Sequence, residues 1–286
     1  MANTIGFGQA AVNNTIDYGQ GAIDNTINWG KSQTLSPSGE TNITGTPDTP
    51  SFSNLNSFSF DGIDEYFIGT STYSELDGQN KATISFWIKP TSVPNYKIIA
   101  SVIRNATTSN HQFQIELTTA RTLQFSIDSS SKYIRSASTP LTLSVWTHVM
   151  YCVDTTLSGA SRGRVFINGV DSTSTSSVGG TFSTSIGALY IGEKESGQYH
   201  PFSGFIDEFA IWSGTDQRAN VSEIYGGGQV VDLNNLATVP QPTTWQRMGD
   251  NATWNGATWT MTDVNGGYTN RSIFMVEANR STDVPT

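Results

Sequence analysis

The sequence predicts an all-β protein, a β-sandwich or jelly roll with an extended N-terminal repeat arm and a β-rich C-terminal tail. Three observations predict this fold class. Apolar and polar residues alternate in many short stretches, as in half-buried antiparallel strands. Only 14% of the 286 residues are charged and 27 are glycine, so the composition favours turns and strands over helices. Before the alternation begins, one eleven-residue phrase occurs three times.

The first 31 residues hold three copies of the phrase Asn-Thr-Ile-x-aromatic-Gly. Their apolar residues have the spacing of an eleven-residue helical repeat, but their glycines disfavour a helix interior. We therefore expect three turns or short helical pieces, ordered only in an assembly, with a flexible Gly/Asn linker as the alternative. Because the repeats are too poor in apolar residues to form a core, we interpret residues 1–31 as an attachment arm. Its predicted docking residues are Asn3, Ile5, Phe7, Gly8, Asn14, Ile16, Tyr18, Gly19, Asn25, Ile27, Trp29 and Gly30.

Residues 32–56 form a predicted spacer, and residues 57–227 carry the alternating pattern of the sandwich. Ser, Thr, Pro and Gly dominate the spacer, which should be semi-extended. The pair Asn168-Gly169 predicts a two-residue hairpin turn, because both positions tolerate positive φ. The apolar residues that mark the strands include Phe58, Phe60, Ile84, Phe86, Ile88, Phe113, Ile115, Leu117, Leu123, Phe125, Ile127, Val149, Tyr151, Val153, Val165, Ile167, Leu189, Ile191, Phe205, Phe209 and Ile211.

Six phrases occur in the order expected of one family. They are Phe60-Asp61-Gly62-Ile63-Asp64-Glu65-Tyr66, Thr83-Ile84-Ser85-Phe86-Trp87-Ile88-Lys89-Pro90, Trp146-Thr147-His148-Val149, Val165-Phe166-Ile167-Asn168-Gly169-Val170, Leu189-Tyr190-Ile191-Gly192 and Phe202-Ser203-Gly204-Phe205-Ile206-Asp207-Glu208-Phe209-Ala210-Ile211-Trp212. In this order they resemble the concanavalin A-like, laminin G type 3 domain. The resemblance implies a concanavalin A-like jelly-roll β-sandwich over residues 57–227, with residues 221–225 as its closing helix.

Residues 228–286 form a Trp-rich extension that should pack on the sandwich or on a neighbouring subunit. Residues 252–259 predict a hairpin about Asn255-Gly256. The phrases at residues 245–250 and 282–285 resemble segments of tailed-bacteriophage virion structural proteins, whose N-termini also resemble the repeats. The resemblance implies a virion protein, assembled in the host cytoplasm. Its implied partners are other virion proteins of the capsid or tail, bound through the arm, and further copies of itself, for which a trimer is our expectation.

Composition and charge exclude several classes of partner. The net charge of -9 and the pI near 4.7 argue against nucleic acid, whose binding needs clustered Lys and Arg. The sequence has no run of ~18 apolar residues, so we expect no membrane span. Its start lacks the basic and apolar segments of a signal peptide, so we expect no export by that route. The single Cys152 lies in an alternating apolar run and should be buried.

We expect no enzymatic activity and therefore no catalytic residues. A glycoside hydrolase of this fold needs two carboxylates across a cleft, about 5–9 Å apart. The phrase Glu-x-Asp-x-x-Glu, typical of such enzymes, is absent. Asp207 and Glu208 are the nearest acidic pair, but neighbours on a strand point to opposite faces. Asp207 should share the face of Phe205, Phe209 and Ile211 and accept backbone hydrogen bonds, with a role as Ca²⁺ ligand as the alternative.

No cofactor or metal site is predicted, and Ca²⁺ is the ion considered as an alternative. Asp61, Asp64 and Glu65 lie within one turn, but no second carboxylate cluster accompanies them. His111, His148 and His200 lack the spacing of metal ligands, and we expect His148 to be a structural strand residue.

A glycan site is a further hypothesis. Sugar sites combine an aromatic platform with planar polar side chains, and such residues occur in or near predicted loops. The candidates are Tyr96, Tyr133, Arg135, Tyr199 and His200. Exposed aromatic residues without a binding role are the alternative.

The sequence therefore predicts a non-enzymatic bacteriophage virion protein, either a capsid decoration or head fibre or a tail fibre or spike. It would dock through its repeats and display the sandwich to cell-surface glycans, where many copies of a weak site gain avidity. The alternatives are a secreted carbohydrate-binding lectin or glycoside hydrolase, and a bacterial adhesin module.

Overall fold

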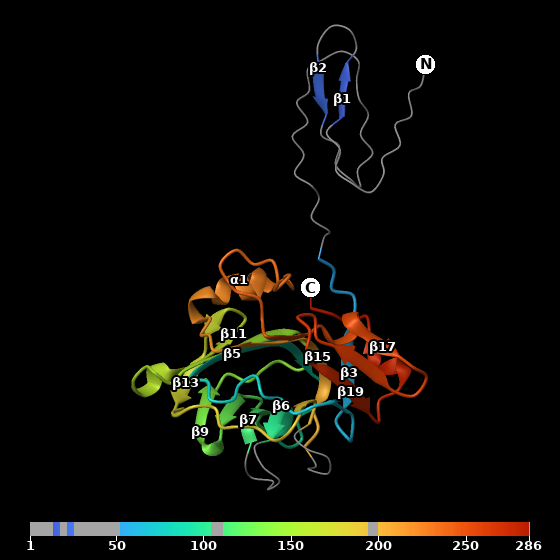
Figure 1. Ribbon diagram of the computed structural model, residues 1–286. Helices are drawn as coiled ribbons and strands as arrows, with labels where there is room; N and C mark the ends of the chain where they lie inside the picture. The colour runs from blue at the N-terminus through green and yellow to red at the C-terminus, as the bar shows by residue number, and fades with distance from the viewer. Residues whose placement is uncertain (1–13, 18–21, 26–51, 104–110, 194–199, 286) are drawn as a thin grey trace. The chain divides into compact units, whose positions relative to one another are not determined.

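The computed structural model describes residues 14–17, 22–25, 52–103, 111–193 and 200–285, and the statements below concern these residues. The chain divides into two units, Met1–Ser53 and Asn54–Thr286, which we describe separately. In the first unit, β1 (Asn14–Asp17) and β2 (Ala22–Asn25) form an antiparallel pair (Figure 1). Its register places Asn14 opposite Asn25 and Ile16 opposite Ile23.

The prediction of turns or short helical pieces is wrong for these two segments of the arm. β-Branched residues such as Thr15, Ile16 and Ile23 favour strands, and each glycine in a helix interior costs ~1 kcal/mol. Among the predicted docking residues, Asn14, Ile16 and Asn25 lie on the two strands. The others, namely Asn3, Ile5, Phe7, Gly8, Tyr18, Gly19, Ile27, Trp29 and Gly30, lie outside the described residues.

The second unit is a sandwich of two antiparallel sheets, as predicted (Figure 1). The first sheet contains, in spatial order, β12 (Val170–Asp171), β11 (Gly163–Ile167), β10 (Thr147–Asp154), β5 (Lys81–Pro90), β15 (Ser203–Ser213), β3 (Ser57–Asp61) and β20 (Arg280–Ser281), while β16 (Thr244–Gln246) also pairs with β15. The second sheet contains β13 (Thr173–Ser176), β9 (Ser129–Ser136), β8 (Leu123–Ile127), β7 (His111–Leu117), β6 (Lys97–Ile103), β14 (Leu189–Ile191), β4 (Tyr66–Gly69), β19 (Thr269–Ile273), β18 (Trp259–Thr262) and β17 (Ala252–Trp254).

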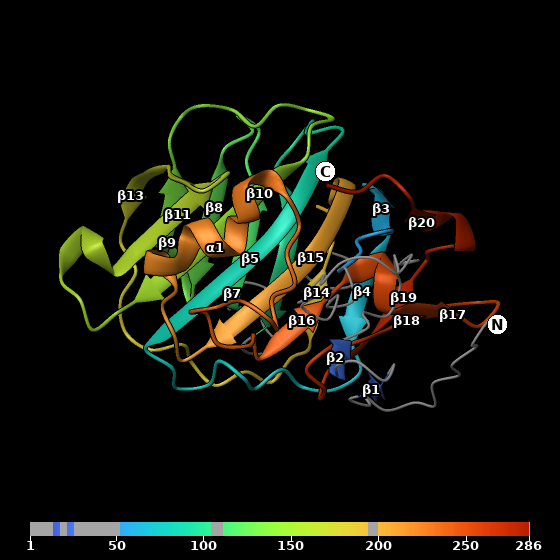
Figure 2. The same ribbon diagram turned by 90° about the horizontal axis from the view of Figure 1, so that it is seen from above.

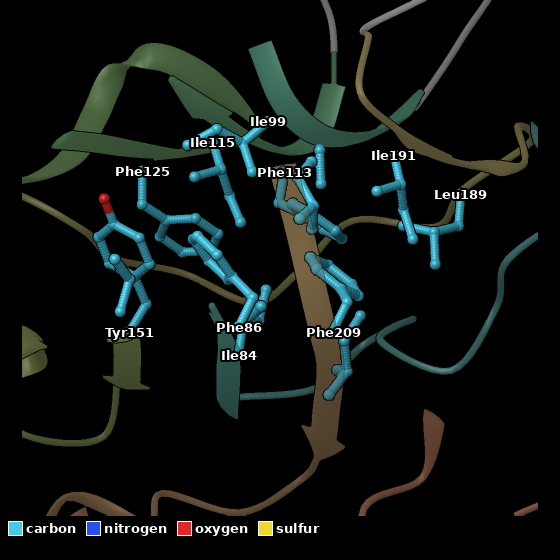
Figure 3. Packing of buried hydrophobic residues seen from close by; sticks show 14 of the residues in the cluster. Ile84, Phe86, Ile99, Phe113, Ile115, Phe125, Tyr151, Leu189, Ile191 and Phe209 are labelled. Carbon is cyan, nitrogen blue, oxygen red and sulfur yellow. The ribbon is translucent and has the colours of Figure 1, made fainter. Parts of the chain in front are cut away.

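The core lies between the sheets and is built from the alternate residues that the sequence marked as apolar. Figure 3 shows side chains of both sheets pointing toward one another. Phe125 of the second sheet stacks on Tyr151 of the first, with ring centroids 5.1 Å apart, and Phe86 stacks on Phe209 at 5.9 Å. Such aromatic pairs add stability beyond the area they bury. Because inward residues are apolar, the polar residues between them are left on the outer faces.

The outer face of the first sheet carries the one α-helix of the described residues, α1 (Val221–Tyr225) (Figure 2). Tyr225 lies against Trp87 and His148, and Gly226 ends the helix with a φ of 63°. The helix confirms the expected closing element. Short 3₁₀ turns are η1 (Gly159–Arg162), η2 (Arg218–Asn220), η3 (Gly226–Gly228), η4 (Met248–Asn251) and η5 (Glu277–Asn279).

The C-terminal residues pair with both sheets. In the first sheet β16 pairs with β15 and β20 with β3, while in the second sheet β19 pairs with β4 and extends the sheet through β18 and β17. The predicted hairpin is confirmed, with Trp254 opposite Trp259. Its loop is held by Asn255, whose side-chain oxygen accepts the backbone N–H groups of Ala257 at 2.9 Å and Thr258 at 2.8 Å.

Candidate functional site

The outer face of the second sheet carries a row of polar side chains across β9, β8 and β7. On β7, Phe113 and Ile115 point into the core, so Gln114 and Glu116 point outward. Strand register then aligns these residues across the sheet. Glu116 lies opposite Gln124 of β8, and Gln124 lies opposite Arg135 of β9.

These side chains form one hydrogen-bonded chain, which we call the polar ladder: Arg135, Gln124, Glu116 and Gln114. Arg135 Nε donates to Gln124 Oε1 at 2.6 Å, and Gln124 Nε2 donates to Glu116 Oε2 at 3.0 Å. Gln114 Nε2 donates to the other carboxylate oxygen, Glu116 Oε1. Both amides therefore hold the Glu116 carboxylate in one orientation, because each carboxylate oxygen has a fixed donor.

Aromatic residues lie at both ends of the polar ladder. At the β9 end, the Arg135 guanidinium lies over the Tyr133 ring, 4.0 Å from its centroid. At the β6 end, the rings of Tyr96 and His200 lie 3.7 Å apart, and 42% of Tyr96 is exposed. Ile98, two residues after Tyr96, lies opposite Glu116, which places Tyr96 beside the ladder. Burial and the nearby negative charge of Glu116 raise the pKa of the Tyr96 hydroxyl.

The structure thus brings four of the five predicted glycan residues, Tyr96, Tyr133, Arg135 and His200, to one face of the sheet. Tyr133 and Arg135 lie on β9 itself rather than in a loop. The fifth, Tyr199, lies outside the described residues.

Three further residues of this face were not predicted from the sequence. They are Gln114, Glu116 and Gln124, and they lie between the pair Tyr133 and Arg135 and the pair Tyr96 and His200. A signal was present, since β7 reads His-Gln-Phe-Gln-Ile-Glu-Leu and alternates planar polar residues with apolar ones. A strand whose outward residues are all amides or carboxylates differs from a solvated face of Ser, Thr and Lys.

A second polar cluster lies on the first sheet, at a β-bulge in β15. The register of β15 against β5 shifts between Asp207 and Ala210, and Glu208 has a φ of 49°. The prediction that Asp207 and Glu208 point to opposite faces is wrong, because the extra residue breaks the alternation. Both carboxylates belong to one buried cluster, while Phe209 packs in the core. Asp207 therefore does not share the face of Phe209 and Ile211.

Around the bulge, the carboxylates of Asp207, Glu208 and Asp250 outnumber the cation Arg247. Glu208 accepts hydrogen bonds from Trp245 Nε1 at 2.6 Å and Arg247 Nε at 3.1 Å, and Arg247 also binds Asp250 at 2.8 Å. Burial raises the pKa of Glu208 to about 7, although Arg247 and Trp245 lower it. Burial and then the charge of Glu208 raise the pKa of Asp207 well above its ordinary value.

This bulge cluster also holds the start of the second unit. Asn54 Nδ2 donates to Asp207 Oδ2 at 2.9 Å, and the backbone N–H of Leu55 donates to Asp250 Oδ1 at 3.1 Å. Asp207 also accepts the backbone N–H of Glu208 at 2.9 Å. The cluster is therefore a structural junction, and its hydrogen bonds do not come from a neighbouring turn as predicted.

The acidic residues considered for Ca²⁺ are engaged in a local turn. Asp61 Oδ1 accepts the Ile63 N–H at 2.7 Å, and Glu65 Oε2 accepts the Asp61 N–H at 2.6 Å. Asn279 Nδ2 donates to the other oxygen of Glu65 at 2.8 Å. Within the described ranges, no three His, Cys, Asp or Glu residues lie together as metal ligands.

His148 and Cys152 are buried and have structural roles. His148 Nε2 lies 2.8 Å from Ser85 Oγ, and burial lowers the pKa of His148 to about 3, so the ring is neutral. Cys152 is buried as predicted, and burial raises the pKa of its thiol. In the part of the chain that the structure describes, the helices are too short or too polar to span a bilayer.

Among solved structures, the chain is similar to a candidate carbohydrate-binding protein from Bacteroides ovatus, with a TM-score of 0.58 and 14% identity over 82% of this chain. It spans 62% of the length of that protein. It is also similar to the native heptameric SAP-like pentraxin of Limulus polyphemus, with a TM-score of 0.49 and 19% identity over 78% of this chain and 98% of the pentraxin. A third similar structure is the CBM40 of the Ruminococcus gnavus IT-sialidase bound to alpha2,3 sialyllactose, with a TM-score of 0.44 and 16% identity over 58% of this chain and 94% of that module.

The identity to the Bacteroides ovatus protein is low, so that likeness shows the fold alone. No curated protein matches the sequence. The laminin G type 3 profile matches residues 62–222, more than half of the chain and within the range that the six phrases predicted. The chain therefore belongs to the concanavalin A-like lectin/glucanases superfamily.

Proposed function

We propose that the protein is a non-enzymatic glycan-binding protein and that the outer face of the second sheet is its binding surface. The observation that carries this proposal is the polar ladder with an aromatic group at each end. Glycans offer hydroxyl groups to planar polar side chains and C–H faces to aromatic rings, and both are present on this face. The description of the Bacteroides ovatus protein as a candidate carbohydrate binder, on the same fold, supports the proposal.

The carboxylates support binding over hydrolysis. Hydrolysis needs an acid and a second carboxylate, about 5–9 Å apart across the substrate. In the polar ladder Glu116 is the single carboxylate, and amide groups occupy both of its oxygens. Asp207 and Glu208 are engaged in the bulge cluster of the other sheet.

A glycan array probed with the full-length protein tests this proposal. We expect binding to at least one glycan, and we expect the double variant Tyr133→Ala/Arg135→Ala to lose at least about tenfold in affinity, because Tyr and Arg anchors typically contribute ~2 kcal/mol or more. The matched control is Arg271→Gln, which removes an exposed arginine of β19 in the same sheet. Binding that survives the double variant would place the site elsewhere, and no binding to any glycan would overturn the proposal.

We further propose that the protein is a bacteriophage virion component anchored by its N-terminal repeats. Support comes from the repeats themselves, and the first residue of the second copy, Asn14, lies opposite the first residue of the third, Asn25. The proposed partners are capsid or tail proteins and further copies of the chain as a trimer, and the proposed location is the virion, assembled in the host cytoplasm. Many copies would raise the avidity of a weak glycan site. A secreted lectin or glycoside hydrolase and a bacterial adhesin are the alternatives.

Deletion of residues 1–31 tests the anchor. We expect the shortened protein to remain folded and soluble and to be absent from purified particles, while the full-length protein co-sediments with them. Detection of the shortened protein in particles at full-length amounts would show that the repeats are not the anchor. Genes for capsid and tail proteins beside the coding sequence are expected for a virion component, and secretion genes would favour the alternatives.

A further inference from the structure

The sequence contains three Asn-Gly pairs, a dipeptide that can modify itself. They are Asn168-Gly169, Asn255-Gly256 and Asn265-Gly266. In such a pair the backbone nitrogen of the glycine can attack the side-chain amide carbon of the asparagine, because glycine has no Cβ atom to obstruct the approach. The reaction needs no partner except water, so the contacts around each amide decide which pair reacts in the folded protein.

The amide of Asn265 is held by residues that are distant in the sequence. Its Nδ2 donates to the Pro242 carbonyl at 2.7 Å, and its Oδ1 accepts from Asn234 Nδ2 at 2.8 Å. Because both ends of the amide are fixed, the Cγ atom cannot turn toward the Gly266 nitrogen without breaking these hydrogen bonds. This pair is therefore protected.

The amide of Asn168 is fixed in another way. Its Oδ1 accepts the backbone N–H of the buried His148 at 2.9 Å, and turning the amide would leave that N–H without an acceptor. A Cβ atom on Gly169 would lie 2.7 Å from the Tyr225 ring, so the turn is also packed under α1. This second pair is therefore protected too.

The amide of Asn255 differs, because among the described residues its hydrogen bonds stay inside the loop 255–258. Its Oδ1 accepts the backbone N–H groups of Ala257 at 2.9 Å and Thr258 at 2.8 Å, and its Nδ2 donates to Thr258 Oγ1 at 3.2 Å. A Cβ atom on Gly256 would meet nothing within 4 Å, and residues 255–257 are exposed. Both the reacting carbon and the water that the reaction consumes therefore have access.

The groups around the Asn255 amide also favour the chemistry. Attack on Cγ converts Oδ1 into an oxyanion, and a pair of backbone N–H donors stabilises this charge more than it stabilises a neutral amide. The Thr258 hydroxyl lies beside Nδ2, where it can pass a proton to the leaving nitrogen. The loop thus supplies an oxyanion-stabilising pair of donors and a hydroxyl for the leaving group.

We propose that Asn255 is a site of spontaneous deamidation, at which the loop between β17 and β18 promotes its own conversion to aspartate and isoaspartate. The Gly256 nitrogen forms a bond to Asn255 Cγ, the Cγ–Nδ2 bond breaks, and the nitrogen leaves as ammonia with the proton given up by Gly256. Water then opens the imide ring at either of its carbonyl groups, giving aspartate or isoaspartate. Overall, water is consumed and ammonia is released.

The isoaspartate product changes the edge of the second sheet. It routes the backbone through the side chain and adds a carbon atom to the loop, whereas aspartate keeps the acceptor for the two N–H groups. In the described sheet, β17 is the last strand and pairs with β18 alone, with Trp254 opposite Trp259. Isoaspartate therefore loosens β17 and the Trp254 side chain that it carries.

Timed incubation of the full-length protein at mildly alkaline pH, followed by mass spectrometry of its peptides, tests the site. In the folded protein we expect Asn255 to deamidate at least about tenfold faster than Asn168 and Asn265. In denaturant we expect the three rates to agree within about threefold, because the shared glycine neighbour then dominates. Equal rates at the three pairs in the folded protein, or faster reaction at Asn168 or Asn265, would overturn the proposal.

The variant Ala257→Pro tests the donors, because proline lacks one of the two N–H groups that bind Oδ1. We expect deamidation of Asn255 to slow by about fivefold or more, whereas the matched control Ala257→Ser keeps the N–H and should react at the original rate. Thr258→Val keeps both N–H donors and the side-chain shape, and should slow the reaction by about threefold or more. Unchanged rates in Ala257→Pro and Thr258→Val would show that the loop does not promote the reaction.

Hydrogen exchange tests the consequence for the sheet. In aged protein enriched in isoaspartate, the amides of residues 252–254 should exchange faster than in fresh protein, while those of β8 and β7 should not change. Equal exchange at residues 252–254 in the two samples would show that the modification leaves β17 in place and would overturn this part of the proposal.

Discussion

Glu208 is a buried carboxylate whose protonation should be visible in the stability of the protein. Burial raises its pKa from 4.5 to about 7, so the folded protein retains this proton at pH values where the unfolded chain has lost it. The stabilising contribution is complete below the unfolded pKa and is lost as the pH rises through the folded pKa. Stability falls with rising pH because the folded state binds this proton more tightly than the unfolded state, and the state that binds more protons is favoured at low pH.

We therefore expect the part of the melting temperature that depends on Glu208 to fall as the pH rises from about 4.5 to about 7. Thermal unfolding of full-length protein and of Glu208→Gln at several pH values measures this. The variant cannot titrate at this position, and Arg247 keeps its ion pair with Asp250, so its melting temperature should change less with pH. Glu193→Gln measures the same effect at a second carboxylate, because burial and the charge of Asp64 also raise the pKa of Glu193 to about 7. A Glu208→Gln protein with an unchanged pH dependence would contradict the assignment.

Individual residues could be predicted where their chemistry is local. The burial of Cys152 followed from the apolar pattern around it, and the structural role of His148 followed from the family phrase that contains it. The alternation of β7 marks Glu116 as an outward residue, but its partners could not be predicted, because they depend on which residues of β8 and β9 lie opposite. The sequence does not specify how β7, β8 and β9 are aligned, because sliding one strand by two residues keeps the same alternation of inward and outward side chains.

At the scale of elements, the turn between β11 and β12 shows how two residues define a hairpin. Asn168 and Gly169 have φ values of 49° and 76°, which the Asn-Gly pair tolerates. A Cβ atom on Gly169 would lie 2.7 Å from the Tyr225 ring, so this turn also sets the space under α1.

Gly169→Ala should therefore destabilise the protein by about 1–3 kcal/mol through backbone strain, with an added cost from the Tyr225 contact. For a unit of this size, each kcal/mol lowers the melting temperature by about 2–4 °C. Gly256→Ala is the matched control, because its φ is 95° but no atom lies within 4 Å of the added Cβ. Equal melting temperatures for the two variants would show that the Tyr225 contact is unimportant.

Elements were predictable where one periodicity dominates and unpredictable where a local irregularity decides. The strands of the sandwich, the Asn168-Gly169 turn and α1 follow from alternation, turn chemistry and the family phrases. Nothing in the sequence marks the bulge at Glu208, because Asp207 and Glu208 look like two ordinary positions of an alternating strand. In the arm, the eleven-residue spacing fitted a helix, yet the spacing of β-branched residues allowed the strands that form.

At the scale of the molecule, the polar ladder depends on a rigid support. Core residues on the inner side of β7 and β8 fix the outward direction of Glu116 and Gln124, so the sandwich presents the ladder without loops. The centre of the candidate site therefore lies on strands, and the residues predicted in or near loops correspond only to its two ends. Side chains on strands are positioned more firmly than side chains on loops, which lowers the entropic cost of binding.

The pairing of β20 with β3 has a consequence for folding during synthesis. Arg280 lies opposite Phe58, and the Ser57 hydroxyl donates to the Asp283 carbonyl at 2.6 Å. On the ribosome, β3 emerges early, but both of its neighbours, β15 and β20, are translated much later. The nascent chain must keep an unpaired strand edge from aggregating until translation has passed residue 283. The sandwich therefore completes its folding as a late event of synthesis.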